Sequence, residues 1–280
     1  MTDTLSLQGI EPYLREKAAI HIYPSLESTN DTAKNMHNPA HGTVIIADYQ
    51  TAGRGRHGRS FFSPTGCGIY MSVVLHPKWF WPDNLALITP MAAVAVCEAI
   101  EATTRKAPQI KWVNDIFLNG KKICGILTET VMDASGEISH IVVGIGINFT
   151  TPPGGFPPEI AQTAGTLFGP EGEYPLVGSI SNLSPTQHCN YHNITRNQLI
   201  AEIINRILSP ENTHQRIIAE YKKRLLVLQR RVSVVSTDTA YEATALDIDA
   251  QGGLIVQKDN GEILTLTTGE VYLSGRCVSQ

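Results

Sequence analysis

The sequence lacks a paired-cysteine framework. Its five cysteines are scattered over 280 residues, and no two of them have the C-x-x-C spacing. Disulfide scaffolds and cysteine-based metal sites depend on short, regular spacings of this kind. We therefore expect reduced thiols and a cytoplasmic protein.

Positive charge is in deficit, and an N-terminal hydrophobic run is absent. Residues 1–20 are polar with short apolar runs, which predicts neither a signal peptide nor a membrane span. The formal net charge of -4 disfavours a protein that mainly coats nucleic acid. The nine histidines show no metal-ligand spacing. We expect neither DNA nor a membrane as a partner.

What remains is the composition of an ordinary globular protein, 42% hydrophobic and 17% charged. A chain of this length accommodates a large domain and a small one. We place the large domain at residues 1–226 and the small one at 227–280.

The apolar patterning of the large domain predicts an α+β fold with a mixed, largely antiparallel sheet. Asn119-Gly120 fits a tight hairpin turn, and Pro90 is expected to kink the helix that contains it. The predicted strands are 20–23, 43–49, 68–75, 110–118, 121–131 and 138–149; the predicted helices are 30–36, 84–104 and 195–224; and a surface loop is predicted at 171–184.

The small domain has a different pattern. Short alternating segments from residue 231 onward are interrupted by Gly252-Gly253 and Asn260-Gly261. Regularly spaced short strands with turn residues between them are typical of a small all-β barrel.

Chemistry is concentrated in the segment Gly53-Arg54-Gly55-Arg56-His57-Gly58-Arg59. Its glycines let the backbone bend closely round a ligand, and its arginines offer guanidinium groups to anionic oxygens. Such a loop suits phosphate. Taken alone, it also fits a solvated arginine-rich turn or an RNA-contacting arm.

Four motifs in order carry a resemblance to biotin protein ligases. They are Glu27-Ser28-Thr29-Asn30; Tyr49-Gln50-Thr51-Ala52 with the Gly/Arg loop; Lys111-Trp112-Val113-Asn114-Asp115 with Lys121-Lys122-Ile123-Cys124-Gly125-Ile126-Leu127; and Gly144-Ile145-Gly146-Ile147-Asn148. The resemblance covers about residues 20–225, and Gly269-Glu270-Val271 resembles part of the family's C-terminal domain. It implies a class II synthetase-like catalytic domain followed by an SH3-like β-barrel.

The resemblance also implies roles for individual residues. The expected biotin-binding residues are Ser28, Thr29, Asn30, Gln50, Gly53, Arg54, Gly55, Arg56, Lys122, Gly125, Gly144 and Gly146. The expected ATP-binding residues are Arg54, Arg56, Arg59, Asn114 and Asn148. The expected catalytic residues are Lys122, Arg56 and Asp115, and no metal ligands are identified.

Two positions depart from the family pattern. Val113 stands where the family has proline, and the loss of a fixed φ there would loosen the local turn. Phe61 stands where some members carry tryptophan, and it can still stack or pack.

The implied activity is ATP-dependent transfer of biotin, through biotinyl-5′-AMP, to a lysine of a biotin carboxyl-carrier domain, with Mg²⁺ accompanying the nucleotide. Some members carry an N-terminal helix-turn-helix and act as repressors. About 20 residues precede the first predicted strand, too few for that module, so we expect no operator binding. The family includes monomers and homodimers, and both stay open here.

Two other functions stay open. A lipoate or octanoate ligase or transferase shares the catalytic fold, although Gln50 and the Gly/Arg loop speak against it. A non-enzymatic RNA-binding module is disfavoured by the acidic charge balance and by the lack of aromatics among the basic residues.

Overall fold

The structure is a computed structural model, and it describes residues 3–79, 85–169, 194–235 and 240–274. Its large domain contains a seven-stranded sheet in the order β1-β2-β3-β7-β6-β5-β4. Only β1 and β2 pair in parallel, and all other neighbours in this sheet are antiparallel. The predicted mixed, largely antiparallel sheet is confirmed.

The strands of this sheet are β1 (Ala19–Tyr23), β2 (Thr43–Ala47), β3 (Gly68–Leu75), β4 (Gln109–Lys111), β5 (Asp115–Leu118), β6 (Lys121–Met132) and β7 (Ile138–Asn148). The helices are α1 (Leu7–Ile10), α2 (Thr29–Lys34), α3 (Ile88–Thr104), α4 (Pro158–Ala161), α5 (Arg196–Ile207) and α6 (His214–Arg224), with short 3-10 turns between some of them.

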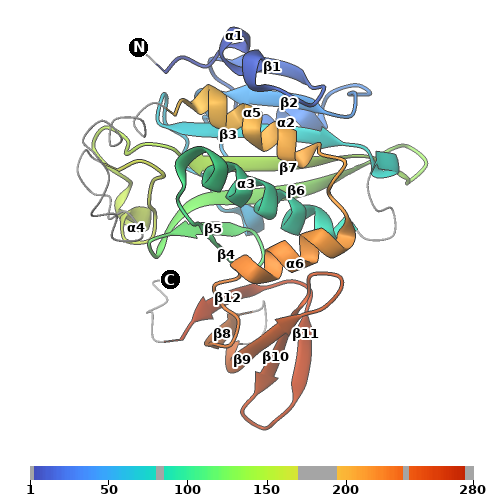
Figure 1. Cartoon of the computed structure of the whole chain (residues 1–280), viewed down its shortest axis with the longest axis vertical. Coiled ribbons are helices and arrows are strands. Elements are labelled where there is room, and N and C mark those ends of the chain that lie inside the picture. The colour runs from blue at the N-terminus through green and yellow to red at the C-terminus, as the bar shows by residue number, and fades with distance from the viewer. Residues whose placement is uncertain (1–2, 80–84, 170–193, 236–239, 275–280) are drawn as a thin grey trace, which may run out of the picture.

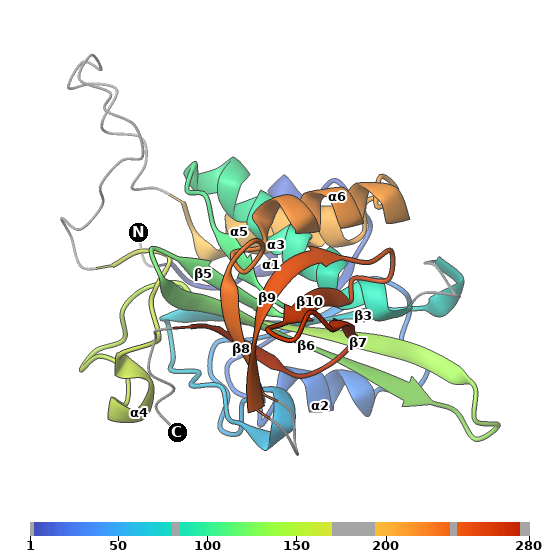
Figure 2. The ribbon, with the colours of Figure 1, turned by 90° about the horizontal axis from the view of Figure 1, so that it is seen from below.

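The helices cover the sheet unequally. Helices α3, α5 and α6 lie on one face, and the short α2 lies on the other (Figures 1 and 2). Helix α3 is apolar on most sides because it is enclosed by the core. The stretch Leu85–Thr104 alone, within the described ranges, is long and apolar enough to cross a membrane, and 72% of its most apolar window is buried in the fold.

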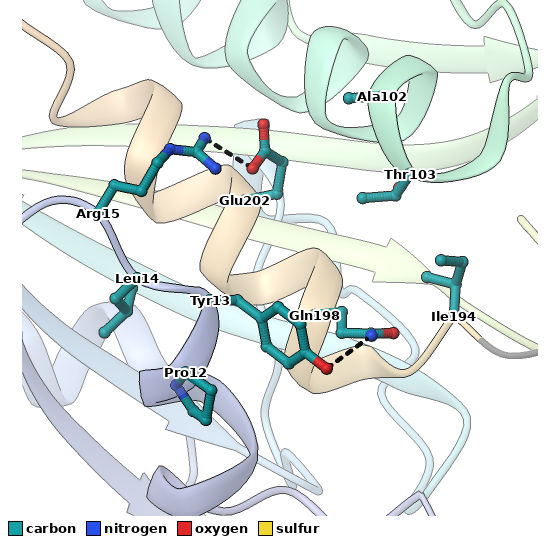
Figure 3. Close-up of a pocket in the computed structure, with 9 residues that line it drawn as sticks. All are labelled: Pro12, Tyr13, Leu14, Arg15, Ala102, Thr103, Ile194, Gln198 and Glu202. Atoms are coloured by element: carbon teal, nitrogen blue, oxygen red, sulfur yellow. Dashed lines mark hydrogen bonds and ion pairs between the residues drawn. The ribbon is translucent and has the colours of Figure 1, made fainter.

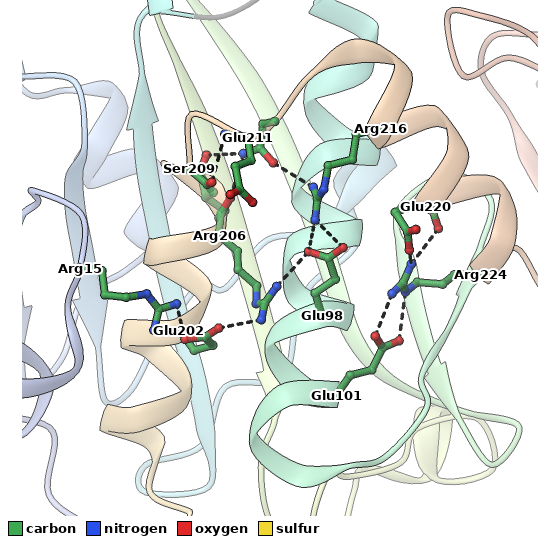
Figure 4. A network of polar contacts seen from close by, with 12 residues as sticks. Arg15, Glu98, Glu101, Glu202, Arg206, Ser209, Glu211, Arg216, Glu220 and Arg224 are labelled. Atoms are coloured by element: carbon green, nitrogen blue, oxygen red, sulfur yellow. Dashed lines mark hydrogen bonds and ion pairs between the residues drawn. The ribbon is translucent and has the colours of Figure 1, made fainter.

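Ion pairs tie the three helices of the covered face together (Figure 4). Glu98 on α3 accepts from Arg206 on α5 at 3.0 Å and from Arg216 on α6 at 2.6 Å. Arg224 at the end of α6 donates to both oxygens of Glu101, at 3.0 and 2.8 Å. These contacts fix the layer of helices behind the sheet.

Two predicted elements are each divided in two. The strand expected at 110–118 is the pair β4 and β5, because the chain reverses between them and Lys111 faces Asp115. The helix expected at 195–224 ends at Ile207 and restarts at His214, since the intervening segment contains Pro210, which has no amide to donate.

Three local features concern the start of α2, the kink expected at Pro90 and the loop expected at 171–184. Ser28 caps α2, and its hydroxyl accepts from the amide of Asp31. Pro90 lies in the first turn of α3, where its missing N–H costs no helical hydrogen bond, so the predicted kink has no cause there. The loop predicted at 171–184 lies outside the described residues.

The C-terminal part is a five-stranded antiparallel sheet in the order β11-β10-β9-β8-β12. Its strands are β8 (Arg231–Val235), β9 (Ala240–Ile248), β10 (Leu254–Lys258), β11 (Ile263–Leu266) and β12 (Glu270–Leu273). It lies beyond β4 and α6 at one end of the molecule (Figure 1). The predicted small all-β domain is confirmed in class, and the boundary at 226/227 stays a prediction.

Candidate functional site

A cleft of about 900 Å³ lies where the large sheet, the Gly/Arg loop and strand β12 meet. Most of the predicted site residues line it. They are Ser28, Thr29, Asn30, Gln50, Arg54, Gly55, Arg56, Arg59, Asn114, Asp115, Lys122, Gly125, Gly144 and Gly146.

One end of the cleft is a chain of hydrogen-bonded polar side chains. Gln50 accepts from the Thr29 amide at 2.9 Å and donates to the Ser63 hydroxyl at 2.9 Å. The buried hydroxyl of Ser72 lies 2.8 Å from the Thr29 hydroxyl and 2.6 Å from Asn30 Oδ1. Each contact restricts how its neighbour is oriented, so the amides of Gln50 and Asn30 have defined directions.

Glycines allow this polar group to lie against the sheet. A Cβ at Gly144 would stand 2.1 Å from Asn30 Oδ1, and a Cβ at Gly146 would stand 2.6 Å from the Phe61 ring. Any side chain at these two positions would therefore displace a wall of the cleft. Gly125 has more room, because its nearest neighbours would be 3.4 Å away.

The Gly/Arg loop is a narrow hairpin closed by backbone hydrogen bonds. Phe61 N donates to Gly53 O at 2.8 Å, and Gly55 N donates to Arg59 O at 2.7 Å. A Cβ at Gly53 would lie 2.5 Å from Phe61 O, so glycine is required for this close approach. At the tip, His57 has a φ of 55°.

The three arginines of the loop contact three separate parts of the molecule. Arg54 pairs with Asp31 at 3.1 Å and with Glu129. Arg56 donates to Asn114 Oδ1 at 3.1 Å. Arg59 pairs with Glu270 on β12 at 2.7 Å. The loop is thus held simultaneously by α2 and β6, by the β4–β5 turn, and by the C-terminal domain.

Opposite the loop, Lys122 Nζ lies 2.7 Å from Asp115 Oδ1. Both residues are on the β5–β6 hairpin, with Asp115 facing Gly125 across the ladder. Asn114 is fixed just before β5, since its Nδ2 donates to Ile126 O at 2.8 Å. A lysine, a carboxylate and an amide are therefore gathered on one rigid hairpin.

The cleft is cationic in a protein of negative net charge. Six of its lining residues are lysine or arginine and three are acidic. Lys111 Nζ lies 4.0 Å from the centre of the Tyr272 ring, and burial lowers the pKa of Lys111 below its ordinary value. Such a surface suits a polyanion.

A second hollow, of about 450 Å³, lies between the N-terminal segment and helices α3 and α5 (Figure 3). Its polar contacts include the Arg15–Glu202 ion pair at 2.8 Å and a hydrogen bond from Gln198 to the Tyr13 hydroxyl at 2.9 Å. None of the predicted site residues lines it. Within the described ranges, no group of three His, Cys, Asp or Glu residues is arranged to hold a metal ion.

Comparison with known proteins identifies the family. Residues 22–148 match the biotin/lipoate A/B protein ligase family, and residues 227–274 match the biotin protein ligase C-terminal domain. The chain thus contains a domain of the biotin/lipoate A/B protein ligase family and a biotin protein ligase C-terminal domain.

Curated relatives agree with this assignment. The bifunctional ligase/repressor BirA of Bacillus subtilis is 41% identical over 150 residues, which cover 53% of this chain and 46% of that protein. The match thus spans about half of that relative's length. A biotin–[acetyl-CoA-carboxylase] ligase of Mycobacterium tuberculosis is 28% identical over 237 residues, covering 82% of this chain and 78% of that protein.

A solved structure of the biotin protein ligase from Aquifex aeolicus, in complex with biotin and ATP, matches with a TM-score of 0.71. It is 25% identical, and the match covers 91% of this chain and 98% of that one. Both the seven-stranded sheet and the C-terminal sheet of this chain therefore have counterparts in one solved structure.

Two predicted site residues do not line the cleft. Gly53 is buried at the base of the loop, where it shapes the backbone. Asn148 donates to Gly165 O at 2.9 Å and so secures the segment that follows α4. The predicted roles of these and the other site residues stay predictions.

The sequence did not reveal every residue around the site. Ser72 lies in a wholly buried strand, where it reads as an ordinary core position, and Glu129 lies near the far end of β6. Glu270 and Tyr272 come from another domain. The one signal in the sequence was the Ser72 hydroxyl in an otherwise apolar strand. A buried hydroxyl requires a hydrogen-bond partner, which would have pointed to polar side chains nearby.

Proposed function

We propose that this chain activates the carboxylate of biotin with ATP and transfers the biotinyl group to a lysine of a biotin carboxyl-carrier domain. The observation that carries the proposal is the arrangement of one cleft. A fixed set of amides and hydroxyls lies at one end, and the Lys122–Asp115 pair faces the cationic loop at the other.

The polar end suits the ureido ring of biotin. That ring presents two N–H donors and one carbonyl acceptor, and a buried polar group without a partner is costly. Asn30 Oδ1 and the hydroxyls of Ser28 and Thr29 can accept, while the second N–H of Gln50 Nε2 can donate. The apolar wall required by the thiophane ring is supplied by Phe61.

The cationic end suits the first reaction step. One carboxylate oxygen of biotin attacks the α-phosphorus of ATP, the bond to the bridging oxygen breaks, and pyrophosphate leaves with that electron pair. Lys122 reduces the repulsion between carboxylate and phosphate and stabilises the charge that develops. Arg56 and Arg59 bind the phosphates and cover the mixed anhydride, which water would otherwise hydrolyse.

In the second step a neutral lysine ε-amine attacks the acyl carbon, and AMP leaves. Asp115 lies in the same cleft and takes the proton that the amine loses. Its ion pair with Lys122 keeps the carboxylate in position between the two steps.

Magnesium enters with the nucleotide in this proposal. Mg²⁺ is usually bound by one or two carboxylates together with substrate phosphates and waters. Asp115 and Asn114 are the side chains at the cleft that fit this role, and Mg²⁺ would neutralise phosphate charge there.

Biotin-dependent exchange of pyrophosphate into ATP tests the first step, with lipoate as the parallel substrate. Exchange with biotin alone supports the proposal. Exchange with lipoate alone would move the chain to the other branch of its family, and exchange with neither would contradict an adenylating function. Transfer to a purified carboxyl-carrier domain then tests the second step.

Three further expectations accompany the proposal. The chain acts in the cytoplasm, it works as a monomer or a homodimer, and it does not bind an operator. Sequence-specific binding to the promoter of a biotin operon would contradict the last of these, and sedimentation at several concentrations decides between the two oligomeric states.

A further inference from the structure

A single carboxylate, that of Glu129, receives three donors from two elements near the cleft. Asn30 Nδ2 and Lys34 Nζ each lie 2.8 Å from its oxygens, and Arg54 Nη2 pairs with it as well. Asn30 and Lys34 are at opposite ends of α2, whereas Arg54 is in the Gly/Arg loop. Glu129 therefore joins the polar end of the cleft to the loop that covers it.

The contact with Glu129 also determines which way the Asn30 amide points. An ionised carboxylate only accepts hydrogen bonds, so the Asn30 NH₂ group must face it. The same NH₂ group donates to Leu127 O at 3.2 Å, and this leaves Oδ1 toward Ser72. With Glu129 removed, the two orientations of the amide would differ far less in energy.

The surrounding charges keep Glu129 ionised. Burial raises the pKa of this carboxyl, but hydrogen bonds from Lys34, Asn30 and Arg54 outweigh burial, and the pKa lies below its ordinary value. All three donors therefore face an anion at neutral pH, and charge-assisted hydrogen bonds of this kind are the stronger ones.

We propose that Glu129 is a positioning residue that fixes the amide of Asn30 for the ring of biotin. Through its ion pair with Arg54, the same carboxylate also holds the Gly/Arg loop in its ordered position. Biotin that binds Asn30 thereby stabilises the closed loop before the adenylate forms. This inference rests on the proposed function, because it takes biotin as the ligand of Asn30.

Asp31 provides a matched control within the same cluster. Its Oδ1 lies 2.9 Å from Lys34 Nζ and 3.1 Å from Arg54 Nη1. It therefore shares the two cations with Glu129, whereas the Asn30 amide is directed to Glu129. Neutralising Asp31 weakens the tether of the loop and leaves the orientation of Asn30 in place.

The experiment compares the parent protein with Glu129→Gln and Asp31→Asn. Calorimetric titration gives the Kd for biotin, and trypsin cleavage at the loop arginines, with and without biotin, reports loop order. We expect Glu129→Gln to raise the Kd about tenfold, as loss of a charge-assisted hydrogen bond predicts, and to abolish the protection by biotin. We expect Asp31→Asn to accelerate cleavage with a change in Kd below about threefold.

The outcomes separate this inference from the proposed function. If the parent protein does not bind biotin, the proposed function fails, and this inference fails with it. If the parent binds biotin and Glu129→Gln retains both its Kd and its protection, the inference alone is overturned. A lower Tm of Glu129→Gln with an unchanged Kd would also overturn it, because the carboxylate would then only stabilise the fold.

Discussion

Arg59 and Glu270 form a two-point ion pair between the Gly/Arg loop and the C-terminal sheet, with Nη1–Oε1 at 2.7 Å and Nη2–Oε2 at 3.1 Å. The Arg59 side chain is 66% exposed, so solvent screens the attraction. Exposed pairs of this kind contribute about 1 kcal/mol or less. Breaking this ion pair so that Arg59 can bind a phosphate therefore costs little free energy.

The first prediction is that the ion pair between Arg59 and Glu270 contributes little to stability. A double-mutant cycle with Arg59→Gln and Glu270→Gln, measured by urea unfolding, should give a coupling energy of about 1 kcal/mol or less. The coupling should fall further in high salt. A coupling above about 3 kcal/mol would mean that the pair is a fixed interdomain bond that does not yield to phosphate.

Lys122→Ala should slow biotin-dependent pyrophosphate exchange by about 10²- to 10³-fold, the range seen when a charge-stabilising donor is lost. Lys121→Ala is the matched control, because Lys121 is adjacent and exposed and its Nζ donates to Gln162 O. The control should stay within about twofold of the parent. An equal loss of exchange rate in the two variants would show that Lys122 is not a catalytic residue.

Arg56→Gly should release biotinyl-5′-AMP into solution, since Arg56 holds the loop to Asn114 over the reactive anhydride. Mass spectrometry of the filtrate after biotin and ATP are added measures the free intermediate. His57→Gly gives the same gain in chain flexibility, and glycine accepts the φ of 55° at that position. Retention of the intermediate by both variants would contradict the covering role of Arg56.

Gly144→Ala should destabilise the fold by about 1–3 kcal/mol and weaken biotin binding, because the new methyl group would overlap Asn30 Oδ1. Gly125→Ala, on the neighbouring strand, meets ordinary contact distances and should leave stability nearly unchanged. Urea unfolding and calorimetry of the two variants make the comparison. Similar values for both would show that the close approach of Asn30 to Gly144 is unimportant.

Lys106 leads to a prediction about pH. Its Nζ donates to Leu167 O and lies 4.6 Å from the centre of the Phe168 ring, and burial lowers its pKa to about 8. Between pH 8 and the ordinary pKa of 10.5, the unfolded chain binds the proton more than the folded one does, so stability contributed by Lys106 rises with pH.

Denaturant unfolding of the parent and of Lys106→Met tests this sign. Any stability advantage of the methionine variant should be largest below pH 8 and should shrink toward pH 10.5. An advantage that stays constant or grows across this range would show that burial does not lower the pKa of Lys106 in the folded protein.

Most residues that line the cleft could be predicted from the sequence, because they come in short, ordered motifs. Ser28, Thr29 and Asn30 begin one helix, and Lys122 and Asp115 lie on one hairpin, so local structure brings them together. The residues that escaped prediction, such as Ser72 and Glu129, belong to strands whose neighbours are set by sheet order.

The division of two predicted elements has a similar cause. The segment 110–118 has the apolar composition of one strand, and only pairing across the turn, with Lys111 opposite Asp115, makes it two. Periodicity reports which face is buried and carries little information on where a chain reverses.

The sequence by itself determined the α+β class, the small β domain, the family and most of the residues around the cleft, because these depend on local patterning and short motifs. Tertiary structure decided what these residues contact. It placed Glu129 in contact with both Asn30 and Arg54, and it placed Glu270 of a distant strand in contact with Arg59. Such contacts arise from strand order and domain packing, which depend on the energy of the whole fold and on no single segment of the chain.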